Sequence, residues 1–513
     1  MLSACVLVAG LAALTAVAPA AAVVAAAGIG LVAIVAHYRW RVLALVCLCG
    51  IAFAAAVSPA ATLLAAVVVG IVVLARRSPA LALGAAVLLF EFEGSVKILL
   101  GLDGVQLPGG NRAAGAAALD VALFVGLAGV LLSDRLRAPR ALWTSATRAE
   151  RIAIATIGAW LVLSLLQIAQ GGDISRGLHG FRLFQWYTLV AVAALTVFWY
   201  PRLRPMALRG VLVIGLLVSL YAALRVVIGP SDSERLFATA VKTVTIYGDT
   251  LRAVGSFSSA IGLSSFLTSL AVFTLVLGLL QPRLRVLSWT VAGLALVGLI
   301  GSYSRTSLFG VALGLVFALL LVFVASDLST RRKLASVGMV VALLAATYGG
   351  LWVASRSSPA LRERAQGVRD PLADSSVKLR IEAWKTVLER VPDRPFGMGV
   401  GWVGAASAGD GNAVRTTDNS FLKVLVDQGV LGLLLFAGGM LAAVAGLARR
   451  LRATAPAGLR PVGIAALAGF VAFLGISFAG ETVEQPGKVL AWGLLGMTAA
   501  YAFGNASVEG EEV

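Results

Sequence analysis

Residues that could bind a phosphate or move a proton are concentrated in one stretch of the chain, from Ser375 to Leu434. Its first part, SSVKLRIEAWKTVLERV, alternates apolar and charged side chains at helical spacing, which predicts an interfacial helix. Arg380 lies one turn from both Val377 and Trp384, so we expect its guanidinium at the membrane-facing edge. The planar guanidinium matches phosphate oxygens, and this position would suit a lipid-borne diphosphate. Alternatively, Arg380 only reaches toward the lipid headgroups.

The interfacial helix has recognisable ends. Asp374 and Ser375 are favourable N-capping residues, and Pro392 and Pro395 follow its last turn. The expected apolar face is made by residues 377, 381, 384, 388 and 391, with charged side chains opposite. The sequence therefore predicts a helix that lies along the membrane surface and not across it.

Asp418, Asn419 and Ser420 open the helix that follows. These residue types are preferred at helix N-caps, so capping is one role for them. A helix N-terminus at a membrane surface also attracts anions, and a capping carboxylate can still face a substrate. The glycine-rich sequence DRPFGMGVGW between the two helices permits a tight turn, but its context is not that of a nucleotide site.

Two further arginines are expected at the same edge of the membrane. Arg252 begins RAVGSFSSAIGL, which leads into an apolar run, and Arg305 lies in GSYSRT between two apolar runs. The gap around Arg305 is so short that its side chain must lie near the headgroup boundary, and an ionisable residue at that depth indicates function. The structural alternative is a side chain that reaches from a helix turn to the headgroups.

The composition shows what positions these residues. Apolar residues make up 59% of the 513 positions and charged residues 13%, and the mean hydropathy is +0.93, whereas a soluble protein has about 25% charged residues. The net charge of +17 comes from short basic clusters between apolar runs, so it indicates membrane topology and not nucleic-acid binding. Cys5, Cys47 and Cys49 lie in or beside apolar runs, which favours neither disulfides nor a cysteine metal site. Residues 1–20 are expected to be a retained first span and not a cleaved signal peptide.

Apolar runs of the length needed to cross a bilayer predict an all-α, polytopic protein with about twelve to sixteen transmembrane helices. Basic loops at alternate ends place both termini in the cytoplasm, segment 170–182 in an outside loop, and Glu481 and Glu484 in a solvated outer turn. We divide the chain into N-terminal helices (1–133), central helices with outer-edge arginines (134–354), an extracytoplasmic loop with the interfacial helix (355–428), and C-terminal helices with a cytoplasmic tail (429–513).

The motifs RAVGSFSSAIGL, SYSRTSLFGVALGLV, KLRIEAWKTVLERVPDRPFGMGVGW and TTDNSFLKVLVDQGVLGLLLF occur in an order that resembles the O-antigen ligase and O-antigen polymerase superfamily. The resemblance covers roughly residues 150–505. It implies the GT-C-like fold of glycosyltransferases that use lipid-phosphosugars. It also implies an inverting, metal-independent and cofactor-free enzyme in the cytoplasmic membrane, with its active site on the extracytoplasmic face.

By this resemblance, the donor would be a glycan on a polyprenyl (undecaprenyl-type) diphosphate and the acceptor a sugar hydroxyl, presented at the outer face of the bilayer. Arg252, Arg305 and Arg380 would bind the diphosphate, and their positive charge would stabilise it as a leaving group. The product would be a cell-envelope polysaccharide, and no nucleic acid would be bound.

The chain departs from the family pattern at the general base. Many relatives of the ligase type carry a His-Asn pair where this chain has Asp418-Asn419, and neither His37 nor His179 lies in that motif. Asp418 is therefore the candidate base, because a carboxylate can accept the proton of the acceptor. His179, in the sequence GGDISRGLHGF, could instead supply the base, although a loop histidine without a catalytic role is the alternative. Arg176, Arg182 and Asn419 are secondary residues, the two arginines as glycan or phosphate contacts.

The missing histidine favours a polysaccharide polymerase over a ligase that transfers glycan to a different acceptor. Two other functions remain open. A transporter of lipid-linked or anionic substrate would have charged or broken helices near the bilayer midplane. A glycolipid-binding scaffold without catalysis would use the same arginines.

Overall fold

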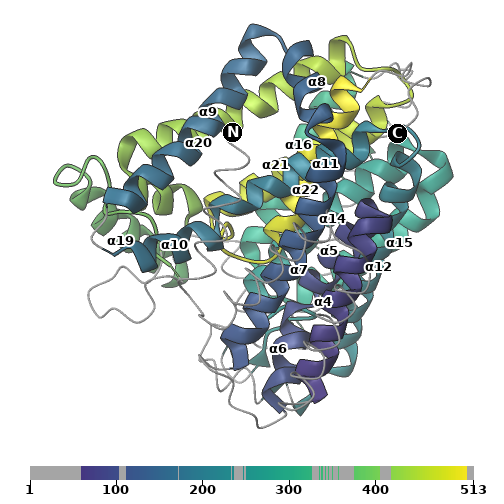
Figure 1. Ribbon diagram of the computed structural model, residues 1–513. Helices are drawn as coiled ribbons and strands as arrows, with labels where there is room; N and C mark the ends of the chain where they lie inside the picture. The colour runs from purple at the N-terminus through teal and green to yellow at the C-terminus, as the bar shows by residue number, and fades with distance from the viewer. Residues whose placement is uncertain are drawn as a thin grey trace, which may run out of the picture.

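The computed structural model describes residues 59–102, 111–170, 173–232, 234–235, 246–247, 250–325, 375–404 and 417–504, together with positions 334, 337, 338, 341, 345, 349 and 356 (Figure 1). The helices are α4 (Pro59–Arg77), α5 (Pro79–Glu91), α6 (Glu93–Leu102), α7 (Asn111–Asp134), α8 (Arg137–Ser145), α9 (Arg148–Gln170), α10 (Ile174–Leu183), α11 (Thr188–Trp199), α12 (Arg204–Ile228), α14 (Ala260–Leu280), α15 (Arg285–Gly301), α16 (Arg305–Ala325), α19 (Ser375–Arg390), α20 (Ser420–Ala453), α21 (Arg460–Phe478) and α22 (Lys488–Phe503). Short 3-10 helices are η1 (Gln185–Tyr187) and η2 (Pro282–Leu284), and the strands β1 (Ile246–Tyr247) and β2 (Thr250–Leu251) pair antiparallel.

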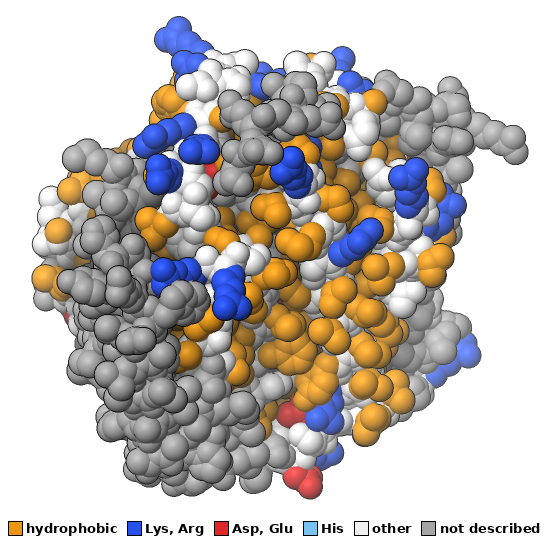
Figure 2. Space-filling model, turned by 45° about the vertical axis from the view of Figure 1, so that its right-hand side comes forward, with side chains coloured by type: hydrophobic (Ala, Val, Ile, Leu, Met, Phe, Trp, Pro, Cys, Tyr) orange, Lys and Arg blue, Asp and Glu red, His pale blue; other side chains and the backbone are white. Residues whose placement is uncertain are grey.

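The protein is an all-α, polytopic membrane protein, as the composition predicts. In the described ranges, 8 helices are long and apolar enough to cross a membrane, and α5 and α22 are shorter apolar helices. Figure 2 shows a broad hydrophobic area on one face, with most of the Lys and Arg side chains toward its upper part. The predicted total of spans also depends on residues 1–58 and on the segment after α16, which lie largely outside the described residues.

The centre of the bundle is formed by α14 and α21, whose residues are mostly buried. Helix α21 packs against α14, α16 and α22. Small residues allow close approach: a Cβ atom at Gly310 of α16 would lie 2.8 Å from the carbonyl oxygen of Ala472 in α21. The antiparallel packing of α16 on α21 places the first residues of α16 beside the last residues of α21.

Helices α9 and α20 pack against each other and run together at one side of the molecule, as Figure 1 shows. The backbone of α20 is broken at Gly429 (φ 71°, ψ −171°), a conformation that favours glycine. A Cβ atom there would lie 2.2 Å from the carbonyl oxygen of Pro395. The break therefore lets the chain around Pro395 approach the helix backbone closely.

The segment 170–182, predicted as an outside loop, is mostly helical, because α10 occupies most of it. Asp173 caps this helix, since its side chain accepts a hydrogen bond from the backbone N–H of Arg176 at 2.9 Å. One face of α10 is buried, including Gly177, Gly180 and Phe181. The chain turns at Phe184 and continues through η1 directly into α11, so the second half of α10 packs into the protein while its first turn is exposed.

Candidate active site

Helix α19 is held against one end of the bundle by apolar contacts and hydrogen bonds. The indole N–H of Trp384 donates to the carbonyl oxygen of Thr417 at 2.9 Å, and its ring lies 6.2 Å from that of Phe478. Val387, which is 2% exposed, packs in a small cluster with Val403 and Val426. The predicted bounds of α19 are confirmed, whereas Asp374 lies outside the described residues.

Helix α19 also buries a residue that lies outside the predicted apolar face. Leu388, expected on that face, is 51% exposed, and Val387 takes the buried position instead. The reason is that α19 packs on protein, the glycine-rich turn and α20, and this packing selects a face rotated by about one residue from the apolar stripe in the sequence. Arg380 is therefore partly enclosed beside Asp418.

The Nε atom of Arg380 lies 3.4 Å from the Oδ2 atom of Asp418, and the two side chains are 28% and 38% exposed. Asp418 itself has φ +45°, in the left-handed region. The N-cap of α20 is Asn419, whose Oδ1 atom accepts hydrogen bonds from the backbone N–H groups of Phe421 (2.9 Å) and Leu422 (3.1 Å). Asn419 thus caps α20, and the carboxylate of Asp418 is directed to the arginine instead of to the helix.

The side chain of Arg252 binds the turn that directly precedes Arg305. The Nε atom of Arg252 donates to the carbonyl oxygen of Ser302 at 2.8 Å, and the neighbouring Ala253 N–H donates to Gly301 at 2.9 Å. Tyr303, inside this turn, has φ +54°, and Arg305 is the first residue of α16. The structure therefore brings together two arginines that are far apart in the sequence.

The Arg380–Asp418 pair lies at the same end of the bundle as Arg252 and Arg305. The first turns of α16, which begin at Arg305, pack beside the last turns of α21, which end at Phe478. The ring of Phe478 in turn contacts Trp384 of α19 and Phe421 at the start of α20. Four of the residues singled out in the sequence, Arg252, Arg305, Arg380 and Asp418, are thus carried by elements that converge around the end of α21.

The secondary residues of α10 lie on the other side of the glycine-rich turn. The guanidinium of Arg176 lies 4.5 Å from the centre of the Trp402 ring and 3.2 Å from Asp173. His179 is half-buried beside Gly180, whose added Cβ atom would lie 2.6 Å from the Cα atom of Gly401. The α10 helix therefore supports the turn that connects α19 to α20.

Arg182 is buried inside the bundle. Its guanidinium pairs with Asp120 of α7 at 2.5 Å, and the hydroxyl of Tyr187 donates to the same carboxylate at 3.0 Å. An arginine in such a buried pair positions helices, because its charge is already compensated.

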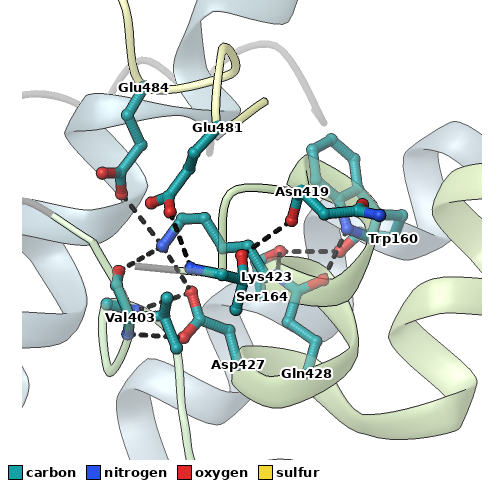
Figure 3. Close-up of polar contacts among 11 residues, drawn as sticks. Trp160, Ser164, Val403, Asn419, Lys423, Asp427, Gln428, Glu481 and Glu484 are labelled. Atoms are coloured by element: carbon teal, nitrogen blue, oxygen red, sulfur yellow. Dashed lines mark hydrogen bonds and ion pairs between the residues drawn. The ribbon is translucent and has the colours of Figure 1, made fainter. Parts of the chain in front are cut away.

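The sequence analysis missed a buried ionic cluster behind Asp418 (Figure 3). The ammonium group of Lys423 lies 3.0 Å from Asp427 and 2.9 Å from Glu484, and it also donates to the carbonyl oxygen of Val403. Asp427 accepts hydrogen bonds from the backbone N–H groups of Val403 (3.0 Å) and Gly401 (3.3 Å). Lys423 therefore fixes the head of α20 to both the glycine-rich turn and the loop before α22.

The prediction that Glu481 and Glu484 lie in a solvated turn was wrong, since they are 7% and 8% exposed. Glu481 accepts a hydrogen bond from the backbone N–H of Thr417 at 3.2 Å, and the Ser420 hydroxyl donates to the carbonyl oxygen of Gly480 at 3.0 Å. A signal for this cluster was present: Lys423 and Asp427 are spaced i, i+4 within an apolar run, and such intramembrane charges seek partners.

The glycine-rich turn satisfies the backbone groups that the break in α20 exposes. The N–H groups of Met398 and Gly399 donate to the carbonyl oxygens of Val426 and Asp427, both at 2.8 Å. The N–H of Val430 donates in turn to Pro395 at 3.0 Å. Broken helices at membrane depth need such partners, so turn and helix form one unit that carries Asn419 and, next to it, Asp418.

The arrangement combines several cations with a partly exposed carboxylate. Three arginines at one end of the bundle can balance the charge of a phosphate or diphosphate, and Asp418 can accept a proton. The buried acids Asp427 and Glu484 surround the ammonium of Lys423, which takes the place a bound cation would occupy. Among the described residues, no group of three or more His, Cys, Asp or Glu side chains could hold a metal ion.

Comparison with known families gives one match, which covers part of the chain. A family model described as O-antigen ligase matches residues 289–437, which include Arg305, Arg380 and Asp418. A search of curated proteins finds no match for the chain. Together with the membrane-spanning helices, this match makes the chain similar to the O-antigen ligase family over residues 289–437 and supports the resemblance to the O-antigen ligase and O-antigen polymerase superfamily.

Proposed function

We propose that the protein transfers glycan from a polyprenyl-diphosphate-linked donor to a sugar hydroxyl at the outer face of the cytoplasmic membrane, as a polysaccharide polymerase. The observation that carries this proposal is the Arg380–Asp418 pair at 3.4 Å, at the same end of the bundle as Arg252 and Arg305 and inside the O-antigen ligase domain. A lipid-linked glycan as the substrate is what the resemblance to this superfamily implies.

In the proposed reaction, the carboxylate of Asp418 accepts the proton of the acceptor hydroxyl. The acceptor oxygen forms a bond to the anomeric carbon while the bond from that carbon to the diphosphate oxygen breaks, which inverts the configuration. The electron pair leaves with the diphosphate. Arg252, Arg305 and Arg380 stabilise the negative charge that develops on the leaving group, so the positive charge comes from arginines instead of a metal.

The Arg380–Asp418 contact adds a coupling between donor binding and base activation. A bound diphosphate would compete with Asp418 for the guanidinium of Arg380, because a phosphate oxygen and a carboxylate oxygen use the same donors. Once Arg380 turns to the diphosphate, Asp418 is available to the acceptor. Donor binding would thereby prepare the carboxylate for its role as base.

Incubating the purified protein with a polyprenyl-diphosphate oligosaccharide, with and without a separate acceptor, tests the proposed function. We expect chain growth on the lipid carrier, detected as a ladder of products. A single transfer that requires the separate acceptor would instead identify a ligase. Movement of intact donor across a vesicle membrane without any new glycosidic bond would refute the enzyme and favour a transporter.

The proposed orientation places α19 and Asp418 outside the cytoplasm and the chain termini inside. It is supported by basic residues at alternate loops, including Arg450 and Arg452 at the end of α20. In a variant without the three native cysteines, Glu389→Cys should react with an impermeant maleimide in intact cells. Ala453→Cys, at the opposite end of α20, should react only after permeabilisation. The reverse pattern would invert the topology.

A further inference from the structure

Two adjoining cavities lie near the end of the bundle opposite Arg380. The first, about 800 Å³ in volume, is formed where α4 meets α5, where α7 ends, and where the chain turns after α11. Its polar lining residues are Arg77, Ser78, Ser133, Asp134, Thr196, Tyr200 and Arg202. This is the end at which the basic connections of the chain gather, so it faces the cytoplasm in the proposed orientation.

The second cavity, about 320 Å³, is an apolar groove between α5, α11, α12 and α22. It shares Ala80 and Val197 with the first cavity, so the two are continuous. Leu81 and Val213, at its rim, are 47% and 49% exposed, and an apolar surface of this kind on a membrane protein faces lipid.

Three glycines keep the groove open. Gly84 of α5, Gly210 of α12 and Gly493 of α22 all line it, and a Cβ atom added at any of them would meet nothing within 4 Å. Elsewhere in the bundle, glycines allow helices to touch, as at Gly310. Here they leave a space between helices, which is the shape that a flexible hydrocarbon chain can fill.

The charges of the first cavity complement a single phosphate. Arg77 and Arg202 are exposed, whereas Asp134 is buried and its carboxylate accepts hydrogen bonds from the hydroxyl of Tyr200 and from the backbone N–H of Ala138 at 2.9 Å. The charged residues that line the cavity are thus two arginines and one carboxylate, a set with a net positive formal charge. One phosphodiester would neutralise it, and arginine is the side chain whose geometry fits phosphate oxygens best.

The length of the groove is close to the depth of one leaflet of a bilayer. Along α5 the groove extends from Ala80 to Leu88, which corresponds to about 12 Å of helix. One leaflet of the hydrocarbon core is about 15 Å deep, half of the roughly 30 Å core. The groove therefore accommodates a chain that enters from one surface and ends near the midplane, and it is too short for a spanning helix.

We propose that the two cavities bind an anionic glycerophospholipid of the inner leaflet. Its phosphodiester headgroup lies between Arg77 and Arg202, and one acyl chain occupies the groove between α5, α12 and α22. This site is independent of the glycan-transfer site at the other end of the bundle, so either can fail experimentally without the other.

Native mass spectrometry of the full-length protein with phosphatidylglycerol, phosphatidylethanolamine or phosphatidylcholine tests this proposal. We expect phosphatidylglycerol to bind most tightly, and the double variant Arg77→Gln/Arg202→Gln to weaken its binding about 30-fold. The matched control Arg209→Gln/Arg283→Gln removes two exposed arginines that do not line the cavity and should change the affinity less than about twofold. Equal binding of the three lipids, or equal effects of both double variants, would overturn the charge argument.

A photo-cross-linking experiment tests whether an acyl chain occupies the groove. A phosphatidylglycerol with a photoreactive group in its acyl chain should cross-link to peptides of α5, α12 and α22. Gly493→Leu should abolish this cross-linking, whereas Gly438→Leu, at an equally open glycine of α20 outside the groove, should not. Cross-linking that avoids these helices would overturn the proposal.

Discussion

Replacing Lys423 with methionine should destabilise the protein by about 3–5 kcal/mol, because it leaves two carboxylates buried without their cation. Asp427 and Glu484 lie 3.0 and 2.9 Å from the ammonium group, and Lys423 itself is only 2% exposed. The loss should appear as a lower midpoint of thermal or denaturant unfolding in detergent. Since the cluster holds the head of α20 against the glycine-rich turn, transfer activity should fall together with stability.

The exposed Lys378 of α19 provides the matched control: Lys378→Met should change the free energy of unfolding by less than about 0.5 kcal/mol. Adding Glu484→Gln to the Lys423→Met variant should recover part of the loss, because one of the stranded charges is removed. If Lys423→Met unfolds at the same midpoint as the unmodified protein, the cluster does not hold this part of the fold together.

Asp418→Asn should reduce glycan transfer by about 10²–10⁴-fold while donor binding is retained or strengthened. An amide cannot accept the proton of the acceptor, which removes the proposed base. It also lacks the charge that competes for Arg380, so the guanidinium becomes more available to the diphosphate. The measurements are the rate of transfer at saturating donor and the affinity for a polyprenyl-diphosphate glycan.

Arg380→Ala should act on the other partner of the same pair and weaken donor binding as well as transfer. Asp393→Asn is the control, because it removes an exposed carboxylate just after α19 that is outside the proposed site. It should leave both the rate of glycan transfer and the affinity for the donor unchanged. A fully active Asp418→Asn variant would show that another group accepts the proton. Weaker donor binding in that variant would contradict the competition between Asp418 and the diphosphate.

Much of the architecture is predictable because each helix carries its own signal. The span lengths, the basic ends and the amphipathic repeat of α19 are local, and the alternation of the spans alone places Arg305, Arg380 and Asp418 at the same end. The resemblance to the O-antigen ligase superfamily was confirmed by the domain at 289–437. The roles of the individual site residues stay predictions.

What the sequence did not predict depends on contacts between distant segments. Asp, Asn and Ser are all good caps, and only the backbone at Asp418, with φ +45°, decides that Asn419 caps α20. The burial of Glu484 depends on its ion pair with Lys423, which lies some 60 positions earlier. In the sequence, Lys423 resembles any lysine in the first turn of a helix, so this pairing could not be predicted. Likewise, α19 buries Val387 and not Leu388 because of the surface that it meets.

The break at Gly429 has a consequence for how the chain enters the membrane. As one straight helix, the 34 residues of α20 would extend about 51 Å, well beyond the roughly 30 Å hydrocarbon core. Insertion machinery that recognises apolar length can therefore choose among several registers for this segment. With the chain redirected at Gly429 and the N–H of Val430 bonded to Pro395, only the part of α20 from residue 430 onward continues as one straight helix. A single glycine thus fixes where the straight part of this helix begins, and with it the length of helix that a bilayer must accommodate.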